Sequence, residues 1–163
     1  MNMKHFITLA GLAATVALVP ATHVAAQAAA GNPVTLTSDV KLDKVVVTNG
    51  VSKHVLVEPK KVVPGDHLIF STQYHNNGAK PIQHFIVTNP LPSAVTLASD
   101  GYGNFDVSVD GGKSWGKLAA LNVSDGKGGQ RAAQATDVTH VRWIVPAIAP
   151  GASGNLEYHA IVR

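Results

Sequence analysis

The chain has 163 residues, of which 45% are hydrophobic and only 14% are charged, and it contains no cysteine. This length fits one domain, and the lack of cysteine excludes a disulfide framework, a thiolate metal site, a cysteine nucleophile and a lipoprotein anchor. The net charge of +3 is far below the clustered positive charge that nucleic-acid binding needs, so we expect no nucleic-acid partner.

Residues 1–28 have the layout of a secretory signal peptide. Lys4 precedes an apolar run over residues 6–19, and Pro20 and a tract of small residues follow the run. The run is about 14 residues long, whereas a membrane-spanning helix needs about 20, so we expect cleavage rather than a membrane anchor. The favoured cleavage site follows Ala28, and a site after Ala26 is the alternative. The predicted location is the periplasm, the cell surface or the extracellular medium.

Residues 29–52 form an extended N-terminal segment that is predicted to add a strand. Residues 34–47 alternate apolar and polar side chains, which is typical of a strand with one buried face. Such a strand completes the protein's own sheet or adds to the edge of a neighbouring molecule, including a second copy of the same chain. The sequence favours the first alternative and leaves the second open.

The remaining chain is predicted to be all-β. Short runs of β-branched residues alternate with clusters of Gly, Pro, Asn and Asp, and no stretch beyond residue 30 has the spacing of an amphipathic helix. A strand about every ten residues is typical of an antiparallel β-sandwich. The predicted strands cover residues 34–37, 41–48, 53–59, 67–75, 82–88, 95–98, 105–109, 115–121, 138–145 and 154–162.

The alternation within single strands predicts which side chains face the core. In the strand over residues 67–75, the face that carries the aromatic residues is expected to point inward. That face contains Leu68, Phe70, Thr72 and Tyr74. In the last two strands, the inward sets are Val141, Trp143 and Val145, and Leu156, Tyr158 and Ala160.

The last two strands are predicted to form a hairpin around residues 146–151. If Trp143 lies opposite Leu156, the same register places Arg142 opposite Glu157 on the outer face. It also places His140 opposite His159, so that two imidazoles become cross-strand neighbours.

Four turns and corners along residues 53–163 resemble, in order, the bacterial family called domain of unknown function 11. The resemblance is carried by Val55-Leu56-Val57-Glu58-Pro59, Val63-Pro64-Gly65-Asp66, Tyr74-His75-Asn76-Asn77-Gly78 and Val87-Thr88-Asn89-Pro90-Leu91-Pro92, with a closing pair of segments, Trp143-Ile144-Val145-Pro146 and Pro150-Gly151-Ala152-Ser153-Gly154. Asn89 stands where the family usually has Asp. The resemblance implies an immunoglobulin-like antiparallel β-sandwich over residues 53–163 of an exported or surface protein, with no enzymatic activity. This chain carries a single copy, whereas the family often occurs as repeats in large envelope chains.

A second local resemblance is to the Asp-box of sialidase-like propellers, at Ser108-Val109-Asp110-Gly111-Gly112-Lys113-Ser114-Trp115. In those proteins the motif holds a β-hairpin turn and is not catalytic. We therefore expect Asp110, Gly112 and Trp115 to have a structural role, as we expect of Trp143 in the core. One copy cannot build a propeller, whose blades repeat the motif.

The sequence contains none of the motifs for nucleophilic, metalloprotease, nucleotide-binding or dinucleotide-binding sites that we considered, so no enzyme, catalytic residue or cofactor is predicted. Six histidines follow residue 28, and His75 and His84, or His140 and His159, are the candidates for a metal pair. The glycine-rich segment over residues 124–131 is predicted to be a loop, either a binding loop or a tolerated insertion.

The sequence therefore predicts an exported, non-enzymatic domain that acts by contact with an envelope or surface protein. The alternative is a periplasmic module that binds a metal ion or a small ligand through His75, His84, His140 or His159.

Overall fold

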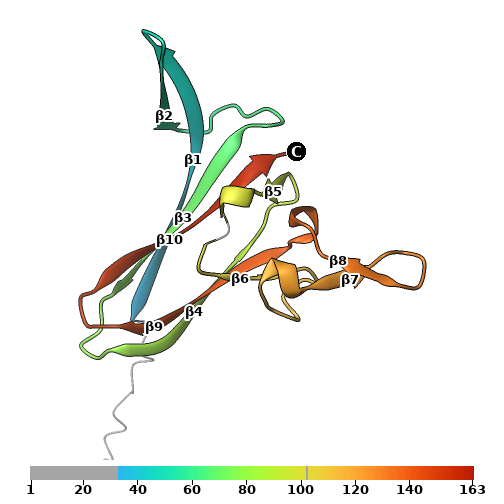
Figure 1. The fold of residues 1–163 in the computed structure, drawn as a ribbon. Helices are drawn as coiled ribbons and strands as arrows, with labels where there is room; N and C mark the ends of the chain where they lie inside the picture. Colours follow the sequence, from blue (N-terminus) through green and yellow to red (C-terminus); the bar gives the residue numbers. More distant parts are fainter. Residues whose placement is uncertain (1–32, 102) are drawn as a thin grey trace, which may run out of the picture. The chain divides into compact units, whose positions relative to one another are not determined.

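The computed structural model of the protein describes residues 33–101 and 103–163. The predicted signal peptide, residues 1–28, lies outside the described residues. The described chain consists of antiparallel strands joined by turns and three short 3₁₀ segments, arranged in a sandwich-like way (Figure 1). The predicted all-β fold is confirmed.

The larger sheet has five strands in the order β2-β1-β3-β10-β5 (Figure 1). Their bounds are β1 Val34–Thr48, β2 Val51–Val57, β3 His67–Asn76, β5 Val95–Leu97 and β10 Ser153–Val162. β1 pairs with β3 over residues 34–43 and with β2 over residues 42–48, so its two halves have different neighbours. The segment that the sequence assigns to an added strand thus belongs to the protein's own sheet.

The smaller sheet has three strands in the order β4-β9-β6, and a separate two-stranded ribbon pairs β7 with β8. The bounds are β4 Ile82–Pro90, β6 Asp106–Ser108, β7 Asn122–Ser124, β8 Gln130–Ala132 and β9 His140–Ile148. The 3₁₀ segments are η1 Ser99–Gly101, η2 Leu118–Ala120 and η3 Ala135–Asp137.

The core lies between the two sheets and is centred on aromatic side chains. Trp143 of β9 lies 5.4 Å from Phe105 and 6.2 Å from Tyr158 of β10, measured between ring centroids. Phe70 of β3 stacks on Tyr158 at 4.7 Å. The predicted inward faces of β3, β9 and β10 are confirmed, since Leu68, Thr72, Val141, Trp143, Val145, Tyr158 and Ala160 are buried and Phe70, Tyr74 and Leu156 pack against them.

The predicted hairpin between the last two strands is wrong. β9 pairs with β4 and β6, whereas β10 pairs with β3 and β5, so the connection crosses from one sheet to the other. Trp143 lies opposite Val87, and Leu156 lies opposite Thr72. The prediction of the inward side chains is nevertheless correct, because each strand turns its apolar face to the shared core, whichever sheet it belongs to.

The corrected register gives the charged residues new neighbours. Arg142 contacts Asp106 at 3.4 Å instead of Glu157, and its guanidinium carbon lies 4.4 Å from the centroid of the Trp115 ring. His140 and His159 lie in different sheets and are not cross-strand neighbours.

Three further strand predictions need correction. Residues 34–37 and 41–48 belong to one strand, because Ser38 and Asp39 stay in register with β3. Residues 115–121 form an isolated bridge at Gly116 followed by η2, and this stretch has no β-branched residue to favour a strand. Residues 124–131, predicted as a loop, include the end of β7 and the start of β8.

Buried polar side chains of β3 join the two sheets. Asn76 is fully buried, and its Nδ2 donates hydrogen bonds to the carbonyls of Lys80, Ile148 and Ala149 at 2.9 to 3.2 Å. Thr72 accepts a hydrogen bond from Asn89 of β4 at 2.9 Å. The turn after β3 and the end of β4, to which these asparagines belong, thus join the β3 sheet to the β4 and β9 sheet.

Candidate interaction surface

The structure does not bring the four candidate histidines together. His75 lies on β3 and shares a hydrogen bond with Ser153 at 2.7 Å, whereas His159 on β10 bonds Asp100 at 3.1 Å. His84 lies on β4 with a φ of 50°, and His140 on β9 bonds Thr139 at 3.0 Å. Within residues 33–101 and 103–163, no three His, Cys, Asp or Glu side chains are placed to hold a metal ion.

The Asp110 carboxylate organises the turn after β6. It accepts hydrogen bonds from the backbone amides of Lys113 and Ser114 at 3.0 and 2.9 Å and from the Ser114 hydroxyl at 2.6 Å. The bond from the Ser114 side chain, followed by that from its backbone, holds the pKa of Asp110 well below its usual range. Gly112 has a φ of 89°, and its carbonyl accepts a hydrogen bond from the Trp115 indole at 3.0 Å.

Trp115 lies against the outer face of the smaller sheet. Its ring contacts the Arg142 guanidinium and lies 6.2 Å from the His140 ring. Asp106 sits beside Arg142 and lies 3.3 Å from the Lys117 ammonium group. Asp110, Gly112 and Trp115 thus make their contacts with other residues of the same domain, as a structural role requires.

We expect the protein to lose stability in acid. The pKa of Asp137 falls to about 2, first through its hydrogen bonds with Arg131, and the pKa values of Asp100, Asp110 and Asp125 are also lowered. Because the pKa of an unfolded Asp is about 3.9, the stabilisation is complete above about pH 4 and is lost as the pH falls toward about 2. Thermal melting between pH 7 and pH 2 measures the loss. The Asp110→Asn variant should melt at a lower temperature at pH 7 and lose less stability between pH 4 and pH 2 than the unchanged protein. An identical pH profile for the variant and the unchanged protein would show that Asp110 does not contribute to the acid sensitivity.

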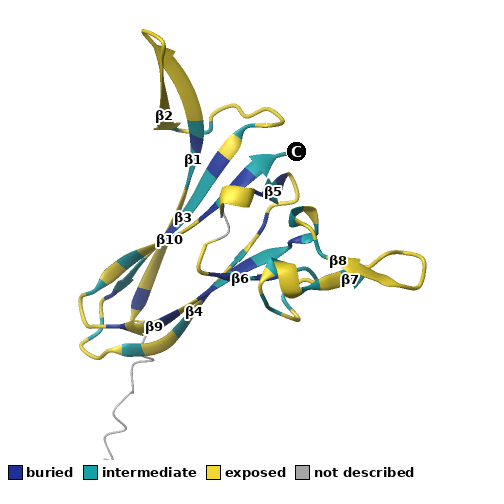
Figure 2. Ribbon diagram, viewed as in Figure 1, coloured by how far each residue is buried: buried dark blue, intermediate teal, exposed yellow. Residues whose placement is uncertain are grey.

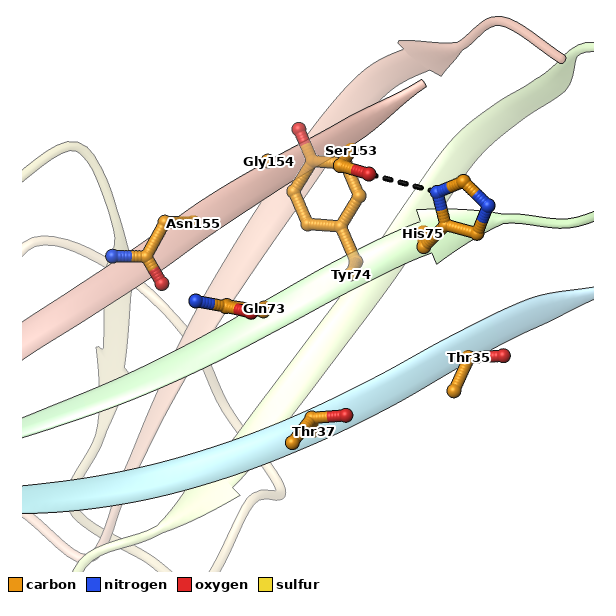
Figure 3. Close-up of a pocket in the computed structure, with 8 residues that line it drawn as sticks. All are labelled: Thr35, Thr37, Gln73, Tyr74, His75, Ser153, Gly154 and Asn155. Atoms are coloured by element: carbon orange, nitrogen blue, oxygen red, sulfur yellow. Dashed lines mark hydrogen bonds between the residues drawn. The ribbon is translucent and has the colours of Figure 1, made fainter. Parts of the chain in front are cut away.

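A shallow polar hollow of about 410 Å³ lies over the outer face of the larger sheet (Figure 3). Neighbouring strands contribute polar side chains to it: Thr35 and Thr37 from β1, Gln73 and His75 from β3, and Ser153 and Asn155 from β10. Gly154 lies opposite Tyr74, and a Cβ added to Gly154 would come within 2.2 Å of the Tyr74 hydroxyl. The lining has no Asp, Glu, Lys or Arg side chain, so it does not indicate a class of ligand.

A second hollow, of about 420 Å³, lies beside β6 and η2. Its walls are mostly apolar, with Phe105, Val107 and Leu118 on one side and the Lys117 side chain at its edge. The Lys117 ammonium group already donates to the Phe105 carbonyl at 2.6 Å and pairs with Asp106. The one charged side chain of the lining is therefore already engaged within the fold, and pocket volume alone does not define a site.

The feature that stands out is the hairpin formed by residues 43–57, which we call the apolar hairpin. It consists of the outer part of β1, the Asn49-Gly50 turn and β2, and it projects beyond the end of β3 (Figure 1). Asn49 and Gly50 have φ values of 52° and 77°, as a tight hairpin turn requires.

Both faces of the apolar hairpin expose large hydrophobic side chains, and Figure 2 shows this part of the chain as almost entirely exposed. One face carries Val45 and Val47, which are 59% and 64% exposed, together with Leu56. The opposite face carries Val46, Val51 and Val55. Contiguous exposed apolar surface of this kind is typical of an interaction site in a folded protein.

Polar side-chain contacts join β1 and β2 at the base of the apolar hairpin. His54 of β2 shares hydrogen bonds with the Asp43 carboxylate of β1 at 2.9 and 3.0 Å. Lys41 contacts Asp39 on its own strand and Glu58, which directly follows β2. Both exposed pairs contribute little to stability, but they orient β2 against β1.

This hairpin is not among the units predicted from the sequence. The two predicted strands over residues 41–48 and 53–59 agree with β1 and β2 to within a few residues, but they were divided between the N-terminal segment and the sandwich domain, and no turn was predicted between them. The signal was present, since Asn-Gly between two β-branched runs is a strong hairpin indicator. The run Val45-Val46-Val47 also breaks the alternation, which places apolar residues on both faces.

The comparisons with known proteins do not name a relative. No family model, no curated protein and no solved structure matches the chain. The residues that the structure describes contain no helix that is long and apolar enough to span a membrane.

Proposed function

We propose that this protein is an exported, non-enzymatic domain of the cell envelope or surface that acts by protein contact, and that the apolar hairpin is its contact surface. The proposal includes the immunoglobulin-like assignment and the relationship to the domain of unknown function 11 that the turn motifs suggest. The observation that carries it is the exposure of Val45, Val47, Val51 and Leu56 on one projecting hairpin.

Burial of these side chains against a partner is favourable. Each large aliphatic side chain contributes about 1.5–3 kcal/mol when it moves from water to an apolar contact. The hairpin also carries Lys44, Lys53 and Asp43, so no strong charge of one sign surrounds the apolar surface. Such a mixed, mainly apolar patch suits a protein partner better than a polyanion.

The test is a pull-down from envelope extract with the described domain and a variant that carries Val45→Lys and Val47→Lys. Both residues are exposed, so the variant is expected to keep the fold and its melting temperature. We expect it to retain at least tenfold less of the proteins that the unchanged domain captures, because two lysines oppose burial of that face.

The matched control carries Ile86→Lys and Ile144→Lys. These two isoleucines lie opposite each other on β4 and β9 and are 55% and 49% exposed, so the control changes an equally exposed apolar pair away from the hairpin. We expect the control to capture the same proteins as the unchanged domain. Equal capture by all three forms, or loss of capture in the control alone, would refute the hairpin as the contact surface.

A further inference from the structure

The outer edge of β2 is a seven-residue strand edge without a partner strand in the described part of the chain. The larger sheet ends at β2, whose described strand partner is β1. Such an edge presents a row of backbone donors and acceptors to another chain. Resting on the proposed function, we infer that this edge pairs with the same edge of a second copy, so that the two larger sheets join antiparallel across a two-fold axis.

The apolar hairpin needs additional strands. Beyond Asp43, β1 pairs with β2 alone, so residues 44–57 form a two-stranded ribbon outside the main sheet. A ribbon of two strands is at best marginally stable in water, whereas three or more strands with an apolar face are stable. Pairing of two ribbons creates four strands, with apolar side chains on both faces of the joined ribbon.

The other outermost strands of the two sheets are protected. β4, at the edge of the smaller sheet, ends at Pro90 and contains His84, which has a positive φ and forms no pair with β9, although the register is the same before and after it. β5 and β6 have three residues each. Prolines, bulges and short strands are the usual devices that block edge pairing. β2 has neither a proline nor a bulge, and Lys53 is its one Lys or Arg residue.

Symmetry restricts the possible registers. A two-fold axis perpendicular to the sheet keeps each side chain on its own face, and opposite residues of an antiparallel pair share a face. The residue numbers of two opposite residues therefore add up to an even number. Full overlap of β2 then centres on His54, with Val51 opposite Val57, Ser52 opposite Leu56 and Lys53 opposite Val55 of the second copy.

The charges favour this register over its neighbour. A shift by two residues in one direction places Lys53 directly opposite Lys53 of the second copy, which is unfavourable. A shift in the other direction shortens the overlap at the Val51 end. In the register centred on His54, Lys53 faces Val55 and each His54 remains beside its own Asp43, which shares hydrogen bonds with it.

The proposed contact also places side chains of the second copy beside those of β2 on both faces of the hairpin. On one face, Leu56 comes beside Ser52 of the second copy, whose β1 neighbour is Val47. On the other, Val57 and Val55 come beside Val51 and Lys53 of the second copy. On the first face Val45 and Val47 flank a seam at which His54 lies opposite His54 of the second copy, and on the second face Val51, Val55 and Val57 lie at the seam. No lysine faces another lysine directly.

Because the protein contains no cysteine, single introduced cysteines report the register directly. Opposite residues of an antiparallel pair have Cα atoms about 4.5 or 5.5 Å apart, within the range that a disulfide spans. We expect the full-length mature protein with His54→Cys to form a disulfide-linked dimer in most of its molecules under mild oxidation. Non-reducing electrophoresis measures this fraction.

The control variant is Lys53→Cys. In the proposed register its two cysteines lie about 8 Å apart, beyond disulfide reach, because they are offset by two residues along the strands. We expect little crosslinking of Lys53→Cys alone and efficient crosslinking when it is mixed with Val55→Cys. This mixed pair leaves His54 unchanged, so it tests the register independently of that residue.

The outcomes separate this inference from the proposed function. Efficient crosslinking of His54→Cys and of the mixed pair, with little for Lys53→Cys, supports the symmetric β2 contact. Equal crosslinking of all variants, or none, overturns it. If none forms while Val45→Lys with Val47→Lys still abolishes capture from envelope extract, the hairpin contacts another protein, and the proposed function stands without this inference.

Discussion

Replacing Trp143 with alanine is expected to lower the free energy of unfolding by about 3–5 kcal/mol, the usual cost of truncating a large buried aromatic residue. Trp143 is 6% exposed and contacts Phe105 and Tyr158, so its ring joins the inner faces of both sheets. Urea unfolding followed by circular dichroism measures the change.

Trp115→Ala is the matched control, since the protein contains two tryptophans and Trp115 is half-buried. Its loss removes the contact with Arg142 and the hydrogen bond to Gly112, which together are worth about 1–2 kcal/mol. Equal destabilisation by the two substitutions would show that Trp143 is not the centre of the core.

Replacing Asn76 with alanine is expected to lower the free energy of unfolding by about 2–4 kcal/mol. Its side-chain amide is the donor for the carbonyls of Lys80, Ile148 and Ala149, and its Oδ1 accepts a hydrogen bond from the Gly78 amide at 2.9 Å. Alanine leaves these backbone groups without their partner, and each buried group left unsatisfied costs about 1–3 kcal/mol. Chemical unfolding again measures the difference.

The neighbouring Asn77 is the matched control because it is exposed. Its Nδ2 donates to the Thr35 hydroxyl at 2.6 Å, on the surface of the domain. We expect Asn77→Ala to cost less than about 1 kcal/mol. A smaller effect at Asn76 than at Asn77 would mean that the Tyr-x-Asn-x-Gly segment does not join the two sheets.

Alternation within single strands was the part of the fold that sequence could predict. The inward positions of Leu68, Trp143 and Tyr158 follow from local periodicity, which does not depend on the neighbouring strand. The pairing of strands, by contrast, depends on which strands become neighbours, and local periodicity does not show this. The last two strands could equally well share a sheet or face each other across the core, because both arrangements bury Trp143 and Tyr158.

The candidate site was the part that sequence predicted least well. The histidines were candidate metal ligands because the sequence has many of them. Their distances from one another depend on the order of the strands, which separates His140 from His159. The exposure of the apolar hairpin depends on where β3 begins, because His67, its first residue, pairs with Asp43 and leaves the rest of β1 without β3 as a neighbour. Val46 and Val47 look like ordinary core residues in the sequence, and they are exposed because β3 ends its pairing with β1 at Asp43.

The most direct test of pairing between two copies through the β2 edge is amide hydrogen exchange of residues 51–57 over a range of protein concentrations. Alternate amides of β2 point away from β1, and these are expected to exchange fast in dilute protein. The account predicts that their exchange slows as the concentration rises, while that of the β4 and β5 edges does not change. Exchange of the β2 amides that is equally fast at every concentration would contradict the pairing of two copies through this edge.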